Sequence, residues 1–102
     1  MRTLTFHFAA SQAPATQVHV GVVASGDLEV LLDTPDGTPE VAEVRVRTSV
    51  DGFDTVWRET LERFFAHTPL GGRWQLNDFG ATPAVVTLRL RQTAEAATEG
   101  RS

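Results

Sequence analysis

Apolar and polar residues alternate along much of the first half of the chain. In Thr3–Phe8 an apolar side chain falls at every second position, and Ala42–Thr48 shows the same period of two with charged residues between. Arg73–Asn77 is a shorter segment of this kind, with Trp74 and Leu76 on its apolar side. A period of two is typical of strands that bury one face, so we predict a strand at each segment.

The longest alternating region is Val18–Asp33, where two apolar stretches flank a Ser-Gly-Asp break. This pattern predicts two antiparallel strands joined by a tight turn, with Ser25 and Gly26 at its tip. Gly26 can adopt the positive φ that many tight turns require. Asp27 can accept hydrogen bonds from nearby backbone amides and so stabilise the turn.

From Phe53 onwards, apolar residues recur at intervals of three and four. This spacing places an apolar and aromatic stripe along one side of a helix, which we predict over about residues 53–67. We interpret the stripe as part of the core rather than as a cofactor pocket. It comprises Phe53, Val56, Trp57, Thr60, Leu61, Phe64 and Phe65.

Two interpretations stay open for residues 84–91. Their apolar residues alternate with polar ones, which favours a strand. The preceding Thr82-Pro83 pair is also a typical start of a helix. The alanine-rich segment Gln92–Thr98 predicts a short helix, and residues 99–102 a flexible tail.

Loops are predicted at Ala9–Gln17 and at Thr34–Glu40, and the second contains two prolines and an Asp-Gly pair. No repeat or linker divides the chain. We therefore predict a single α+β domain over residues 1–98. Its two layers would be a mostly antiparallel sheet and one long helix that covers it.

The composition of the 102-residue chain excludes several classes of protein. The absence of cysteine excludes disulfides and thiolate metal sites, and all 9 basic residues are arginine. Without lysine the chain is neither a biotin- or lipoyl-type carrier nor a Schiff-base enzyme. A net charge of −4 argues against nucleic acid as a partner. No apolar run is long enough for membrane insertion and no signal peptide is recognisable, so we expect a cytoplasmic protein.

The histidines and the paired aspartates do not form a recognisable site. His7 and His19 are predicted on the polar sides of strands, and His67 near the end of the helix. None has a second ligand at metal-binding spacing, so we predict no metal site. Asp33 and Asp36 flank a turn and are predicted to accept local backbone hydrogen bonds.

Ser25 is the strongest candidate for covalent chemistry, because the predicted turn would hold its hydroxyl on an exposed corner. It lacks the G-x-S-x-G motif of hydrolases and a neighbouring base, so we predict no catalytic residue and no hydrolase activity. From the local pattern alone, Ser25 is most simply a turn residue. A plain protein-interaction module therefore remains an alternative.

Four segments together resemble the acyl carrier (delta) subunit of malonate decarboxylase. They are TLTFHF near the start, ASGDLEVLL at residues 24–32, RTSVDG before the predicted helix and DFGATPAVVTLRL near the end. They span almost the whole chain in the same order as in the family. A fainter similarity reaches the acyl carrier (gamma) subunit of citrate lyase, in the Ser-Gly-Asp, in a Ser-Val before the helix and in Asp78–Ala81.

In the malonate decarboxylase family, the serine of Ser-Gly-Asp bears 2'-(5''-phosphoribosyl)-3'-dephospho-CoA through a phosphodiester. The resemblance implies covalent attachment of this group at Ser25, with Gly26 and Asp27 supporting the turn. It implies a carrier without catalytic activity of its own, which presents acetyl and malonyl thioesters to other subunits. A chain produced alone would then be in the apo form.

The partners that the resemblance implies are the acyl-transferase (alpha) subunit, the decarboxylase (beta and gamma) subunits, a malonyl transferase and the prosthetic-group transferase (holo-carrier synthase). A citrate lyase-type carrier stays an alternative. The TLTFHF segment and the fuller ASGDLEVLL match favour malonate decarboxylase.

Overall fold

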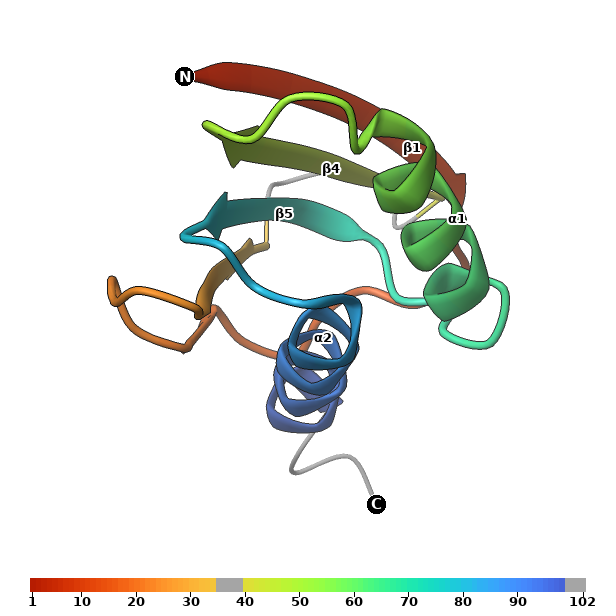
Figure 1. Cartoon of the computed structure of the whole chain (residues 1–102). Helices are drawn as coiled ribbons and strands as arrows, with labels where there is room; N and C mark the ends of the chain where they lie inside the picture. Colours follow the sequence, from red (N-terminus) through yellow and green to blue (C-terminus); the bar gives the residue numbers. More distant parts are fainter. Residues whose placement is uncertain (35–39, 99–102) are drawn as a thin grey trace.

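The structure, a computed structural model, describes residues 1–34 and 40–98. Two helices cover one face of a five-stranded sheet (Figure 1). The strands are β1 (Arg2–Ala9), β2 (Val18–Val20), β3 (Leu28–Asp33), β4 (Val41–Thr48) and β5 (Gly72–Asp78). The helices are α1 (Asp54–Phe65) and α2 (Pro83–Thr98).

The sheet is mixed, with the strand order β1-β4-β5-β3-β2. Three of its neighbouring pairs are antiparallel, as predicted for most of the sheet. The exception is the parallel pair of β4 and β5. These strands are joined through α1, and such a crossover returns the chain to the end of the sheet at which it started.

The alternation of the strands places their apolar side chains against the helices. Val44 and Val46 of β4, together with Trp74 and Leu76 of β5, are fully buried. Helix α1 lies over β1, and α2 lies over β3 and β2 (Figure 1). One long helix was predicted to cover the sheet, but two helices share this layer.

Helix α1 falls within the predicted range, and Trp57, Phe64 and Phe65 are buried as expected. The prediction was wrong for Phe53 and Val56, which are 49% and 39% exposed. Phe53 precedes the first helical residue with φ −111° and ψ 17°, so it does not continue the buried stripe.

The strand favoured at residues 84–91 was also wrong, because this segment belongs to the longer helix α2. Thr82 starts the helix: its Oγ1 accepts a hydrogen bond from the Val85 amide at 3.3 Å, and Pro83 is the first helical residue. Leu88, which the alternation placed inward, is 49% exposed. The buried positions instead recur at intervals of three and four, as Val86, Leu90, Thr93 and Ala97.

The predicted hairpin has a wider connection than a tight turn. Strand β2 ends at Val20, and the loop Gly21–Asp27 leads to β3. Gly21 ends the strand with φ +85°, and an added Cβ there would overlap the Leu28 carbonyl oxygen. The first strand, predicted to continue up to the Ser-Gly-Asp break, therefore ends earlier, at Val20.

Several predictions fall on residues outside those described. The predicted turn at Thr34–Glu40 lies largely on residues 35–39, which include Asp36, and the predicted tail lies on residues 99–102. Within the described part of the chain, neither helix is long and apolar enough to cross a membrane.

Candidate functional site

Ser25 occupies the second position of a β-turn formed by Ala24–Asp27. The Asp27 amide donates a hydrogen bond to the Ala24 carbonyl oxygen at 3.1 Å, and Gly26 has φ +82°. A glycine with positive φ at the third position is typical of type II turns. Ser25 is exposed, and its hydroxyl makes no hydrogen bond to any described residue.

The turn is attached to the end of the sheet by two backbone hydrogen bonds. The Gly26 amide donates to the Phe79 carbonyl oxygen at 2.7 Å, and the Phe79 amide donates to the Asp27 carbonyl oxygen at 3.1 Å. They extend the antiparallel pairing of β3 with β5 beyond Leu28 and Asp78. The backbone on the C-terminal side of Ser25 is therefore fixed, while its side chain stays accessible.

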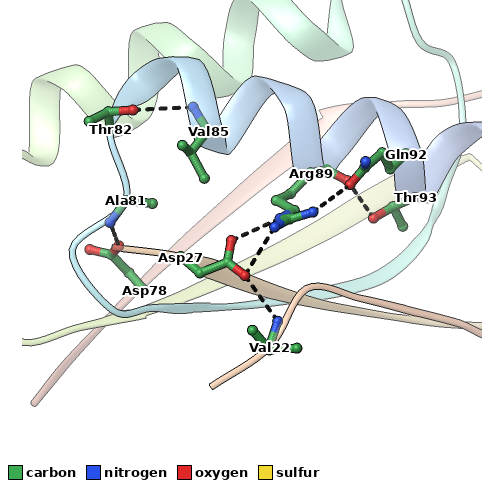
Figure 2. A network of polar contacts seen from close by, with 9 residues as sticks. All are labelled: Val22, Asp27, Asp78, Ala81, Thr82, Val85, Arg89, Gln92 and Thr93. Carbon is green, nitrogen blue, oxygen red and sulfur yellow. Dashed lines mark hydrogen bonds and ion pairs between the residues drawn. The ribbon is translucent and has the colours of Figure 1, made fainter. Parts of the chain in front are cut away.

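Asp27 fixes the loop at both ends through its carboxylate (Figure 2). Its Oδ2 accepts the Val22 amide at 3.1 Å, which holds the start of the loop against its end. Arg89 of α2 forms a bidentate pair with the same carboxylate, with Nε to Oδ1 at 2.8 Å and Nη2 to Oδ2 at 3.1 Å. Bidentate arginine–carboxylate pairs constrain both orientation and distance, so α2 holds the Ser25 loop in place.

The hydrogen bonds from Arg89 and from the backbone amides of Leu28 and Val22 lower the pKa of Asp27 to about 2. The side chains of the pair are 12% and 27% exposed, so water screens them only in part. Asp27 is therefore ionised across the physiological range. Arg89 was not predicted as a functional residue. In the sequence it lies between Leu88 and Leu90, and the alternation of residues 84–91 would place it on the polar face of a strand.

A second buried contact joins the neighbouring strand ends. Thr48 Oγ1 at the end of β4 donates to Asp78 Oδ2 at the end of β5, at 2.9 Å. The other oxygen of Asp78 accepts the amides of Gly80 and Ala81 at 3.1 and 2.9 Å. Because β4 and β5 are parallel, three of the segments that carry the family resemblance meet at this end of the sheet.

An apolar groove of about 330 Å³ opens between the start of α1 and the start of α2, beside these strand ends. Phe53 and Val56 are its exposed wall, at 49% and 39% exposure. Its other side chains include those of Trp57, Thr60 and Pro83. Phe53 is therefore exposed because its side chain borders this groove instead of packing in the core.

The remaining candidates lie away from the turn. His7 and His67 are exposed, and His19 lies 3.0 Å from Glu29 in a surface pair. Asp33 accepts the Thr34 backbone amide at 3.1 Å, as predicted, and it also accepts the Gln17 side chain at 2.6 Å. Among the described residues there is no cluster of three or more side chains suited to a metal ion.

Replacing Asp27 by asparagine is expected to lower the midpoint of thermal unfolding at neutral pH and to change it little near pH 2. The pKa of Asp27 in the folded chain is lower than the value of about 3.9 for an unfolded aspartate. The ionised carboxylate therefore stabilises the fold above about pH 4, and this stabilisation is lost as the pH falls towards 2. Midpoints measured for both proteins from about pH 2 to 7 should converge in acid.

The matched control is Asp51→Asn, because the side chain of Asp51 is 84% exposed in its pair with Arg2. A pair this exposed contributes little, so its midpoint should stay close to that of the parent at every pH. A constant difference between Asp27→Asn and the parent across the pH range would contradict the assignment.

Comparison with known proteins gives a consistent result. The family model for the malonate decarboxylase delta subunit (MdcD) matches residues 15–97. The chain belongs to this family. The family predicted from the four segments is therefore confirmed.

Curated relatives are similar to this chain over most of their length. The malonate decarboxylase acyl carrier protein of Pseudomonas fluorescens is 48% identical over 96 residues, covering 93% of this chain and 95% of the relative. The malonate decarboxylase acyl carrier protein of Burkholderia cepacia is 51% identical over 78 residues, covering 76% of this chain and 70% of the relative. The fold also matches a chain in the crystal structure of a Pseudomonas malonate decarboxylase hetero-tetramer in complex with malonate. The TM-score is 0.85 at 46% identity, covering 93% of this chain and 97% of that one.

Proposed function

We propose that this chain is the acyl carrier subunit of a malonate decarboxylase, with Ser25 as the covalent attachment point and no catalytic activity of its own. The supporting observation is the combination at Ser25 of a free, exposed hydroxyl and a fixed backbone. A transferase needs such a hydroxyl to form a phosphodiester. Family membership supports the same role.

The surroundings of Ser25 fit attachment of a bulky phosphodiester. An added Cβ on Gly26 would meet nothing within 4 Å, so the space beside the serine is open. No general base is hydrogen-bonded to its hydroxyl among the described residues, which fits modification by a separate enzyme better than self-catalysis. The proposed group is 2'-(5''-phosphoribosyl)-3'-dephospho-CoA, which would supply a thiol that holds acyl groups as thioesters.

The chain itself contributes a stable platform and a fixed tether point. Asp27, Arg89 and the two backbone hydrogen bonds to Phe79 keep the Ser25 loop in one conformation. A substrate on a tether meets each active site at an effective concentration of the order of millimolar. The carrier therefore promotes successive reactions by proximity, without acid–base chemistry of its own.

The proposed partners are the acyl-transferase (alpha) and decarboxylase (beta and gamma) subunits, the malonyl transferase and the holo-carrier synthase. The structural relative is part of a hetero-tetramer, which supports association with other subunits. The net charge of −4 suits partner surfaces that bear arginine or lysine. We place this assembly in the cytoplasm.

The intact mass of the chain, purified from its own host during growth on malonate, tests the proposal. The expected result is a mass excess equal to the phosphoribosyl-dephospho-CoA group, located on the Ser25 peptide by fragmentation. The same chain produced without the holo-carrier synthase is the control and should have the unmodified mass.

An unmodified chain from cells that actively decarboxylate malonate would contradict the proposal. The plain interaction module, in which Ser25 is only a turn residue, would then replace it. A modified chain isolated in complex with citrate lyase subunits would identify the citrate lyase-type alternative.

A further inference from the structure

We propose that the apolar groove between α1 and α2 binds the adenine ring of the group attached to Ser25. This inference rests on the proposed function and adds a second, non-covalent site to the carrier. It assigns the groove to Phe53, Val56, Trp57 and Thr60 of the α1 region, with Pro83 at the start of α2.

The groove lies next to the Ser25 turn. The amide of Gly26, the residue after Ser25, donates to the Phe79 carbonyl oxygen at 2.7 Å, and the next residue, Gly80, lines the groove. A Cβ added to Gly80 would lie 3.9 Å from the Gly26 nitrogen. A group attached at Ser25 therefore starts beside the rim of the groove.

The lining selects a neutral, flat ligand. The volume of the groove, about 330 Å³, and its aromatic walls of Phe53 and Trp57 are typical of a small-molecule site. No arginine or histidine lines it among the described residues, so it offers no partner for a phosphate. The one carboxylate in the lining, Asp78, already accepts hydrogen bonds from Thr48, Gly80 and Ala81.

The hydroxyl of Thr60 is a polar group in the groove that can bind a ligand. It lines the groove and is only 8% exposed, yet its hydroxyl makes no hydrogen bond to any described residue. The helical threonines Thr93 and Thr98 instead donate to the carbonyl oxygen four residues earlier. This hydroxyl is therefore available to a ligand in the groove, and the edge of a purine offers both donors and acceptors.

The order of parts in the proposed group favours adenine over the thiol end. A phosphoribosyl unit separates Ser25 from the adenosine, so the base is the neutral ring closest to the attachment point. The charged pyrophosphate follows, and then the pantetheine with its thiol. Holding the base in the groove would leave the thiol end free to reach the partner subunits.

Nuclear magnetic resonance of the complete chain tests this inference. Methyl signals of Val56, Thr60 and Val86 should shift between the apo chain and a holo chain whose modification is verified by mass. The signal of Val41, which does not line the groove, should not shift. Free adenosine, titrated to concentrations above the millimolar range of a tethered ligand, should shift the same groove methyls of the apo chain, whereas pantetheine should not.

Thr60→Val is expected to weaken adenosine binding about 2- to 10-fold, the effect of one hydrogen bond. The matched control is Thr55→Val, an exposed threonine of α1 outside the groove lining, which should bind as the parent does. Phe53→Ala should weaken binding further and still fold, because Phe53 is 49% exposed.

The two proposals fail in different ways. An unmodified chain contradicts the proposed function. A modified chain whose groove signals equal those of the apo form, with no response to adenosine, overturns the adenine site alone. Groove signals that respond only to a partner subunit would overturn it as well, and would make the groove a protein contact.

Discussion

Replacing Ser25 by alanine is expected to abolish malonate decarboxylation by the assembled enzyme. The remaining rate should equal that of a preparation that lacks this chain. The variant has no hydroxyl to form the proposed phosphodiester, so the proposed arm and its acyl group would be absent. Ser25 is exposed and its side chain makes no hydrogen bond among the described residues, so stability should stay within about 0.5 kcal/mol of the parent. Carbon dioxide release from the reconstituted complex and thermal unfolding of the chain measure the two effects.

Ser11→Ala is the matched control, because Ser11 is also an exposed serine in a loop. It should keep both the added mass and the activity. Full activity of Ser25→Ala in an assembled complex would refute the attachment site. Failure of the variant to join the complex would show that Ser25 acts in subunit contact instead.

Replacing Trp74 by alanine is expected to reduce the free energy of unfolding by about 3–5 kcal/mol. Trp74 is fully buried in the central strand β5, with its ring edge-on to Phe64 and Phe65 at centroid distances of 6.0 and 5.2 Å. Removing it leaves a cavity beneath α1 that neighbouring rings cannot fill without moving. Since small domains are stable by about 5–15 kcal/mol, denaturant unfolding should detect the loss readily.

Trp74→Phe is the matched control. It keeps an aromatic ring in the core, and the indole nitrogen that it removes is buried without a hydrogen-bond partner in the described part of the chain. Trp74→Phe therefore removes no hydrogen bond, and its free energy of unfolding should fall clearly less than that of Trp74→Ala. An equal loss in both variants would show that ring packing is not the main contribution of Trp74.

The fold separates a rigid platform from the exposed side chain of Ser25, the proposed attachment point. The core under α1 gives the sheet its stability, while the strand ends near Asp78 position the Ser25 loop. The Asp27–Arg89 pair connects that loop to α2, so the helix supports the proposed attachment site as well as the core. A carrier benefits from this arrangement because its backbone stays fixed while the proposed arm moves.

Much of this protein is determined by its sequence alone. A period of two placed the strands, and a period of three to four placed α1, because these periods follow directly from backbone geometry. Ser-Gly-Asp predicted a turn with an exposed serine and a positive φ at Gly26, which the structure confirms. The absence of lysine and cysteine excluded whole classes of chemistry without reference to any fold.

Other features are decided only by the tertiary structure. Residues 84–91 fit either a strand or a helix locally, and burial of Val86 and Leu90 on the face of α2 that packs on the sheet selects the helix. The pair of Asp27 with Arg89 joins residues 62 positions apart, and no local pattern encodes that distance.

The parallel pairing of β4 with β5 determines the rest of the site. It brings Thr48 to Asp78 and places the start of α1 beside the start of α2, which creates the groove. Periodicity specifies which face of an element is buried but not which neighbour covers it. That choice depends on how all the apolar faces pack together, and so the turn at Ser25 was predictable while the contacts that support it were not.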